Sequence, residues 1–150
     1  MDTVPHIEVR DLSMAYGDFI VQSGLDFVVN KGDIFIVMGG NGCGKTMLMR
    51  ALVGLQKPVA GSVLYSGEDF WNAAADEQQR LKRRLGILFQ GGALWSSLTL
   101  AENVALPIAE YTGLPQARVE EIVAFKLALV GLAGCEDLYP AELSGGMKKR

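Results

Sequence analysis

The sequence predicts a mixed α/β fold, and three observations lead to this prediction. Short apolar runs bounded by glycine, aspartate or asparagine, which are typical of buried strands, alternate with helical patterns up to about residue 90. A glycine-rich loop joins one of these apolar runs directly to a helical pattern. Beyond residue 90 only helical patterns remain. With 150 residues, of which 49% are apolar, the chain can bury a sizeable core without disulfides.

The predicted elements follow one another in a simple order. Strands are predicted over residues 6–10, 25–30, 33–38, 61–66 and 86–90. Helices are predicted over residues 45–53, 76–85, 99–111 and 115–132. Gly54 ends the first of these helices, and Pro115 is placed as the first residue of the last one, where its missing N–H is harmless.

Composition excludes several classes of protein. The 14 lysine and arginine residues are outnumbered by 17 aspartate and glutamate residues, so no broad basic surface for nucleic acid is expected. The longest apolar runs are far shorter than the roughly 20 residues of a membrane-spanning helix, and no export signal is expected at the N-terminus. Cys43 and Cys135 are too few for a disulfide framework. We expect neither nucleic acid as a partner nor a direct membrane span.

Glycine is the one residue type in clear excess, and much of the excess lies in one loop. Residues 39–46 read GGNGCGKT and match the pattern G-x-x-x-x-G-K-[ST] between a predicted strand and a predicted helix. In such a P-loop, backbone N–H groups turn inward around a phosphate, the lysine reaches the β- and γ-phosphates, and the hydroxyl of Thr46 is offered to Mg²⁺. A dinucleotide-binding loop does not fit, because it would need glycine in place of Lys45. The predicted nucleotide-binding residues are Gly39, Gly40, Asn41, Gly42, Cys43, Gly44, Lys45, Thr46 and Met47.

A second glycine motif, LSGGM at residues 143–147, stands before a basic end of the chain. Alone it would fit an ordinary capped helix start. Its position after the P-loop makes the chain resemble the nucleotide-binding subunits of ABC transporters, in which an aromatic residue, a P-loop, a glutamine and an LSGGQ-like signature follow in this order. Tyr16, the P-loop, Gln90 and residues 143–147 match this order, and the resemblance covers essentially the whole chain.

The resemblance implies a role for each of these residues. Tyr16 would stack on adenine, and local packing at a strand end is the alternative for this side chain. Gln90 would contact Mg²⁺ and the attacking water, and a polar strand end is its alternative. Ser144, Gly145 and Gly146 would act in trans, by holding the γ-phosphate of an ATP bound to a second copy of the chain.

The same resemblance predicts the architecture and the partners. A P-loop NTPase fold of the ABC type would place an N-terminal β subdomain and part of a RecA-like core in residues 1–90, a helical subdomain in residues 91–143, and the signature with the start of its helix in residues 143–150. Two copies would pair head to tail and would bind transmembrane permease subunits at the cytoplasmic face of the inner membrane. ATP and Mg²⁺ would be the ligands, and Lys45 and Gln90 would be the catalytic residues.

Two catalytic parts of the family have no match in the sequence. In the family, a buried strand that ends in Asp-Glu and a switch histidine follow the signature. None of the acidic pairs in this sequence follows four apolar residues, and the lone histidine is His6. We therefore expect that the C-terminal part of the core is missing and that the chain is inactive alone. We also expect an unpaired apolar sheet edge, and hence weak stability and aggregation.

Short stretches narrow the resemblance further. The LSGGM signature and the stretches FQGGALW and LAENVALP are similar to the ATPases of bacterial envelope lipid transporters of the Mce/Mla type. Two alternatives stay open. A soluble ABC-type ATPase of DNA repair or chromosome maintenance shares the P-loop and the signature, but the segment 91–143 is too short for the long insertions of that class. A non-catalytic nucleotide-binding module is the other alternative.

Overall fold

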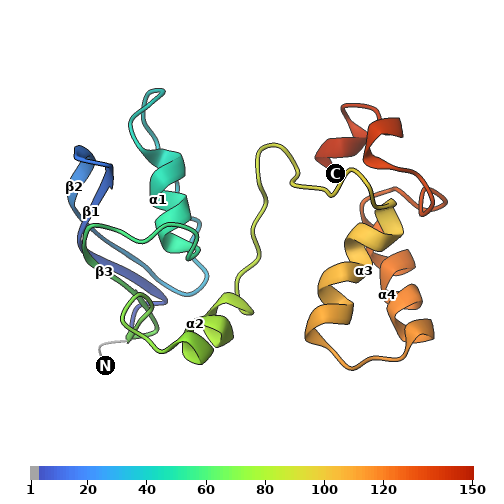
Figure 1. The fold of residues 1–150 in the computed structure, drawn as a ribbon, viewed down its shortest axis with the longest axis horizontal. Coiled ribbons are helices and arrows are strands. Elements are labelled where there is room, and N and C mark those ends of the chain that lie inside the picture. Colours follow the sequence, from blue (N-terminus) through green and yellow to red (C-terminus); the bar gives the residue numbers. More distant parts are fainter. Residues whose placement is uncertain (1–3) are drawn as a thin grey trace. The chain divides into compact units, whose positions relative to one another are not determined.

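The computed structural model describes residues 4–150 and divides into two compact units (Figure 1). The first unit ends at Ile87, and the second unit runs from Leu88 to Arg150. Each unit has its own buried apolar cluster. The predicted α/β fold class is confirmed, because strands and helices together form the first unit and helices form the second.

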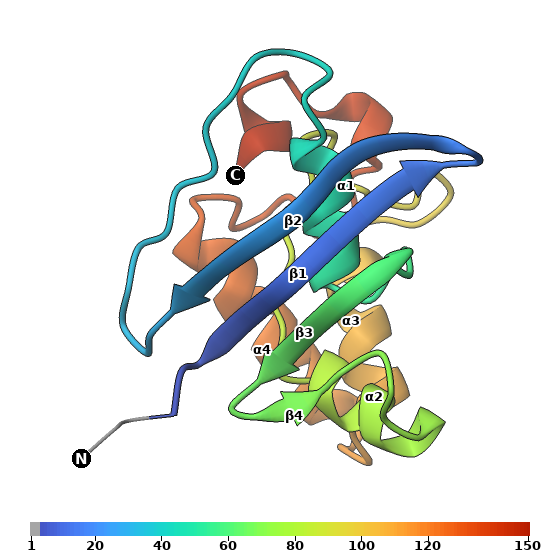
Figure 2. The same cartoon turned by 90° about the vertical axis from the view of Figure 1, so that its left-hand side faces the viewer.

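The first unit is built on a four-stranded antiparallel sheet with the strand order β2-β1-β3-β4. The strands are β1 (Ile7–Tyr16), β2 (Phe19–Val29), β3 (Ala60–Tyr65) and β4 (Glu68–Asp69), and the helices are α1 (Lys45–Leu52) and α2 (Ala75–Lys82). Figure 2 shows α1 lying across one face of the sheet. One buried cluster joins Val9 and Met14 of β1 to Leu48 and Ala51 of α1. This packing fixes the start of α1 relative to the strands.

Phe70 lies at the centre of the core of the first unit. Its side chain is 0% exposed. The rings of Tyr65 and Trp71 each form a T-shaped contact with the Phe70 ring, with centroid separations of 6.0 and 5.1 Å. The ammonium of Lys82 lies 5.8 Å from the ring centroid, and the Phe70 N–H donates to the Val63 carbonyl over 2.9 Å. Phe70 therefore ties the end of the sheet to α2.

Tyr65 links β3 to α1 through a buried hydroxyl. The hydroxyl donates to the carbonyl of Leu52, the last residue of α1. Burial raises the pKa of Tyr65 to about 12. In the unfolded chain an exposed tyrosine ionises near its ordinary value of about 10.

The raised pKa of Tyr65 predicts a loss of stability at alkaline pH. Above a pH of about 10 the unfolded state releases the tyrosine proton, whereas the folded state keeps it up to about pH 12. The contribution of Tyr65 to the free energy of unfolding should therefore fall by about 1.4 kcal/mol per pH unit across this window. We expect the stability advantage of the wild type over Tyr65→Phe to shrink as the pH rises. Urea unfolding of both proteins at several alkaline pH values measures this difference in stability. A difference that stays constant with pH would contradict the prediction.

Strands β1 and β2 are longer than the apolar patterns predict. A bulge at Asp11, where φ is +45°, shifts the register between β1 and β2. The carboxylate of Asp26 accepts a hydrogen bond from the Asp11 N–H over 2.9 Å, so the bulged backbone group has a partner. After the bulge, Leu12 and Met14 again point into the core. The predicted end of the first strand at residue 10 and the predicted start of the second at residue 25 are both wrong, because the bulge interrupts the alternation on which they rest.

The predicted buried strand over residues 33–38 is also wrong, since the structure gives this segment no regular secondary structure. It keeps the alternation of a strand nonetheless. Phe35 stacks on Phe27 of β2 with a centroid separation of 4.9 Å, and Val37 packs against the core. On the other side Ile34 and Met38 are 91% and 85% exposed. One side of the segment is thus packed, and the other presents apolar side chains to solvent.

The predicted strand over residues 86–90 is absent as well. Residues 86–89 have no regular structure, and Gln90 lies in a turn in which the Gly92 N–H donates to the Phe89 carbonyl over 3.0 Å. The predicted burial is wrong too, because Ile87, Leu88 and Phe89 are exposed. A strand needs a neighbouring strand to pair its backbone groups, and the structure describes none for this segment.

The exposed side of residues 33–38 predicts self-association of the isolated chain, because an extended apolar segment without a paired neighbour is a template for further chains. Ile34→Ser and Ile36→Ser should raise the monomeric fraction, whereas Val37→Ser should not, since Val37 packs inward. Size-exclusion chromatography with light scattering measures the fractions. A soluble monomer with a sharp, reversible thermal transition would contradict this prediction.

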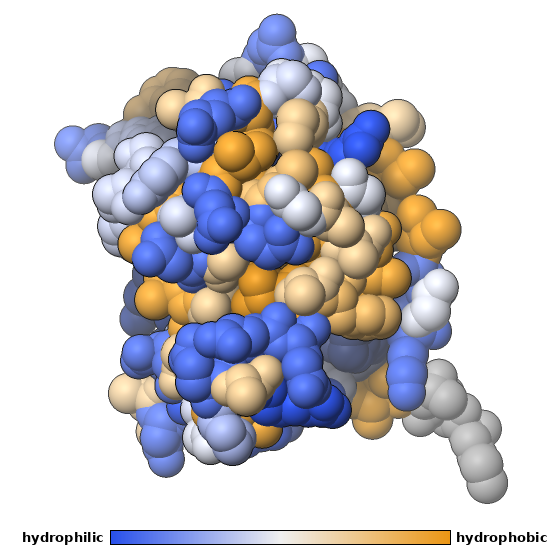
Figure 3. Space-filling view, turned by 90° about the vertical axis from the view of Figure 1, so that its right-hand side faces the viewer, coloured by the Kyte–Doolittle hydropathy of each residue, from blue (hydrophilic) through white to orange (hydrophobic). Residues whose placement is uncertain are grey.

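The second unit consists of helices. It contains α3 (Leu100–Tyr111), α4 (Gln116–Leu129) and the short 3₁₀ turns η1 (Pro140–Glu142) and η2 (Met147–Lys149). Thr99 caps α3, because its hydroxyl accepts from the Glu102 N–H over 3.2 Å while the Glu102 carboxylate accepts from the Thr99 N–H over 2.7 Å. Figure 3, which views the molecule from the side of this unit, shows hydrophobic residues at the surface among hydrophilic ones.

Helix α4 is shorter than predicted at both ends. Pro115 is its N-cap and lies just before the helix instead of being its first residue. The helix ends at Leu129 because Gly131 adopts a φ of +70°. This turn lets the Leu132 N–H donate to the Leu127 carbonyl over 2.8 Å. The core of the unit comprises Leu100, Val119, Val123, Leu127, Leu132 and Leu143.

Candidate functional site

The glycine-rich loop leads from the extended segment 33–38 into α1 and lies at the N-terminal end of that helix (Figure 2). Gly42 and Gly44 adopt φ values of +79° and +92°, which disfavour every residue with a side chain. A Cβ atom on Gly44 would also lie 2.9 Å from Cγ of Gln22. Glycine at position 44 is therefore required both by the backbone conformation and by the neighbouring strand.

Lys45 reaches back across this loop. Its ammonium donates to the carbonyls of Gly39 and Gly40, over 2.8 and 2.6 Å. No side chain caps the N-terminus of α1, and its first turn contains no acidic residue. The first backbone N–H groups of the helix therefore have no competing carboxylate, and together with Lys45 they form a positively polarised end that suits an anion.

The side chains of the other predicted loop residues differ in how far they are exposed to solvent. Asn41 and Thr46 are exposed, and the Thr46 hydroxyl lies in the first turn of α1. The side chain of Met47 is buried in the core, so only its backbone can serve the loop. Cys43 is half-buried, and its Sγ lies 3.6 Å from the Lys45 ammonium. Within the described residues, no group of three or more histidine, cysteine, aspartate or glutamate side chains could hold a metal ion.

Tyr16 lies in the same unit as the loop, at the end of β1, with its side chain 62% exposed. Two contacts connect its strand to the loop. Met14, two residues before Tyr16, pairs with Gln22 on β2, and the Gln22 amide donates to the carbonyl of Cys43. Tyr16, the predicted adenine-stacking residue, and the P-loop thus belong to the same unit. Gln22 is part of this connection. The sequence does not predict its contact with the loop, because a lone polar residue in a strand belongs to no motif.

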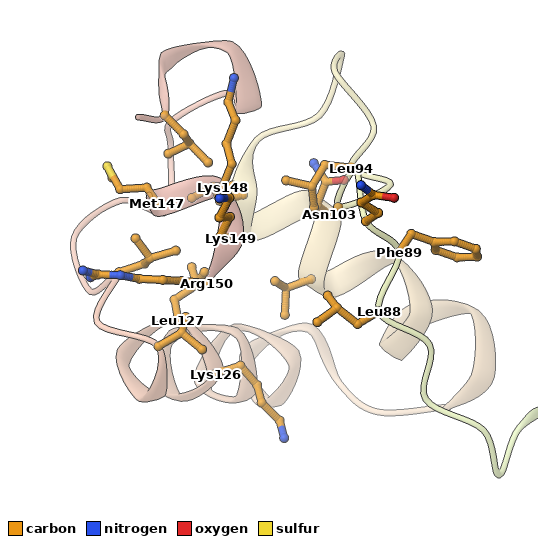
Figure 4. Close-up of a pocket in the computed structure, with 17 residues that line it drawn as sticks. Leu88, Phe89, Leu94, Asn103, Lys126, Leu127, Met147, Lys148, Lys149 and Arg150 are labelled. Carbon is orange, nitrogen blue, oxygen red and sulfur yellow. The ribbon is translucent and has the colours of Figure 1, made fainter. Parts of the chain in front are cut away.

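Gln90 belongs to the second unit and lines a cavity of about 570 Å³. Figure 4 shows Leu88, Leu94 and Leu127 around this cavity, together with basic side chains from the end of the chain. The P-loop belongs to the first unit, and the structure describes the two units separately.

The signature residues also lie in the second unit, where Leu143 is buried and anchors them. Ser144, Gly145 and Gly146 follow it and are exposed. The Ser144 hydroxyl accepts from the Met147 N–H over 3.2 Å, which closes a turn over the two glycines. The three residues therefore present an exposed turn to solvent, directly before η2.

Comparison with known families decides what kind of chain carries this loop and signature. Residues 22–150 match the family described as ABC transporter. The chain belongs to this family of ABC transporter ATP-binding domains. The resemblance predicted from the four motifs is thereby confirmed.

Relatives within the family support the narrower resemblance. The chain is 41% identical over 144 residues to the "Intermembrane phospholipid transport system ATP-binding protein MlaF" of Haemophilus influenzae, covering 96% of this chain and 54% of that protein. It is 37% identical over 144 residues to the "Probable ribonucleotide transport ATP-binding protein mkl" of Mycobacterium tuberculosis, covering 96% of this chain and 40% of that protein. The chain thus spans about half the length of the curated relatives it matches.

Solved structures confirm the fold. The "Dimeric Structure of MJ0796, a Bacterial ABC Transporter Cassette" superposes with a TM-score of 0.84 at 26% identity, covering 95% of this chain and 65% of that chain. The predicted P-loop NTPase fold of the ABC type is therefore correct, although residues 33–38 and 86–90 do not form strands in this chain.

Proposed function

We propose that this chain is the ATP-binding part of the energy-supplying subunit of an ABC transporter. The observation that carries the proposal is the shape of the P-loop, in which glycines with positive φ turn the backbone and Lys45 lies across the loop at the free N-terminus of α1. Such a loop matches a triphosphate in charge and in donor arrangement. Tyr16, exposed in the same unit, supplies an aromatic face for adenine.

Within this proposal each residue has a role in phosphate chemistry. Lys45 holds the β- and γ-phosphates, and the Thr46 hydroxyl and the Gln90 amide are the ligands that this chain offers to Mg²⁺. When bound, Mg²⁺ neutralises phosphate charge. Gln90 orients the attacking water. Ser144, Gly145 and Gly146 of a second copy, paired head to tail, complete the site, because their exposed turn offers N–H groups to a γ-phosphate.

The complete protein would hydrolyse ATP, whereas this chain alone would do so hardly at all. Hydrolysis needs a carboxylate to accept the proton of the attacking water, and none of the acidic pairs in these 150 residues directly follows four apolar residues. Purified chain should therefore bind ATP without steady turnover. Steady hydrolysis that disappears in Lys45→Ala would contradict this part of the proposal.

The transported substrate and the partners are proposed from the relatives. The MlaF relative is named for intermembrane phospholipid transport, so we propose a phospholipid or another lipid as the cargo. Among residues 4–150, no helix is long and apolar enough to cross a membrane. Transmembrane permease subunits would carry the cargo, and this subunit would bind them at the cytoplasmic face of the inner membrane. The subdomain division at residues 90 and 143 is part of the same proposal.

Isothermal titration of the isolated chain with ATP, ADP and AMP tests nucleotide binding directly. We expect ATP and ADP to bind in the presence of Mg²⁺, and AMP to bind at least about ten-fold more weakly, because AMP lacks the phosphates that the loop encloses. Chelation of Mg²⁺ should weaken ATP binding. Equal affinities for ATP and AMP would overturn the assignment of the loop.

A further inference from the structure

Gln22 reaches from the sheet to the P-loop. It lies on β2, is half-buried, and pairs across the ladder with Met14, which is itself buried in the core. Its side-chain amide donates to the carbonyl of Cys43, in the loop. The neighbouring residues of the sheet hold Gln22 in place, so the loop is bonded to a rigid element.

A second contact lies at the other side of the same peptide bond. The Cα atom of Gly44 approaches β2 so closely that an added Cβ would lie 2.9 Å from Cγ of Gln22 and 3.1 Å from Cγ1 of Val21. Gly44 has a φ of +92° at this point. The strand therefore contacts both residues that form the peptide between Cys43 and Gly44.

The direction of this peptide decides where the next donor points. In a trans peptide the C=O and the N–H lie in one plane and point in opposite directions. Because the Cys43 carbonyl points to Gln22, the Gly44 N–H points away from β2. This N–H is one of the donors of the loop that Lys45 spans through its bonds to the Gly39 and Gly40 carbonyls.

We propose that Gln22 is a positioning residue for phosphate binding. Its amide fixes the peptide between Cys43 and Gly44 so that the Gly44 N–H is presented to the phosphates of a nucleotide. This inference rests on the proposed function of the loop. It adds to that function a side chain outside the loop that orients one of the loop's donors.

Two substitutions separate the hydrogen bond from the packing. Gln22→Met keeps the methylene groups beside Gly44 and removes the donor, whereas Gln22→Glu keeps the shape and replaces the donor with a carboxylate. Both should weaken ATP and ADP binding about three- to ten-fold, the effect of one lost hydrogen bond, and should leave AMP binding unchanged. Ser23→Ala, a substitution at the exposed neighbouring residue, is the matched control and should bind all three nucleotides as the wild type does. Wild-type affinity for ATP in Gln22→Glu would overturn the proposal.

A second readout needs no nucleotide. Only at Cys43 does a cysteine precede a glycine in this sequence, so labelling cysteine carbonyls with ¹³C and glycine amides with ¹⁵N isolates one NMR signal, that of the peptide in question. This signal should shift in Gln22→Met and in Gln22→Glu and stay in place in Ser23→Ala. An unshifted signal in all three variants would overturn the positioning role. If the wild type bound no ATP, the proposed function would fail, while the signal would still decide whether Gln22 sets this peptide.

Discussion

Replacing Lys45 with alanine should reduce the affinity for Mg-ATP by about a hundred-fold or more. The ammonium lies across the loop, where it donates to the carbonyls of Gly39 and Gly40. Two charge-assisted hydrogen bonds to phosphate oxygens, each of about 1.5–3 kcal/mol, account for a loss of this size. Titration of both proteins with ATP in the presence of Mg²⁺ measures it.

Lys31→Ala is the matched control for this substitution. It removes the same charge from an exposed turn after β2, so ATP affinity should change by less than about two-fold. Lys45→Arg tests geometry, because a planar guanidinium cannot replace a compact ammonium between two carbonyls. If Lys45→Ala bound Mg-ATP as tightly as the wild type, the loop would not be the nucleotide site.

Replacing Phe70 with alanine should lower the free energy of unfolding of the first unit by about 3–5 kcal/mol. The ring is fully buried between Tyr65, Trp71 and Lys82, so its removal leaves a cavity and breaks two aromatic contacts. A loss of this size is a large part of the total stability of an ordinary domain.

Urea unfolding followed by tryptophan fluorescence measures the effect of Phe70→Ala. The chain has two tryptophans, and in a Trp95→Phe background Trp71 alone reports on the first unit. Phe19→Ala is the control, because that ring is exposed and its loss should change stability by less than about 0.5 kcal/mol. Equal midpoints for the two variants would show that Phe70 is not at the centre of the core.

Local signals in the sequence predicted the start of each helix to within one residue and the glycine-rich loop before α1, but they placed the ends of α2 and α4 three residues too late. Capping residues and glycines act on their immediate neighbours, so the start of α1 after Gly44 and the start of α3 after Thr99 could be predicted from short stretches. The chemistry of the loop stays a prediction of the same local kind, since its donors belong to consecutive residues.

Features that depend on distant segments could not be predicted. An apolar run shows that residues 33–38 tend to be buried, but only a second strand can turn that tendency into a ladder. The bulge at Asp11 is stabilised by Asp26, a residue of another strand, and no pattern within β1 indicates it. Gln22 is a further example, because its role arises only where β2 passes the loop.

The extended segment 33–38 has a consequence for handling the protein. Proteases bind substrates as extended chains, and this stretch offers an accessible backbone with Met38 and Ile34 at its surface. Limited proteolysis should therefore cut between β2 and the loop before it cuts the sheet. Because Val37 packs against the core and Phe35 stacks on Phe27 of β2, the two pieces should stay associated after the cut. A nicked chain of this kind would allow the strands and the P-loop to be labelled, exchanged or replaced separately.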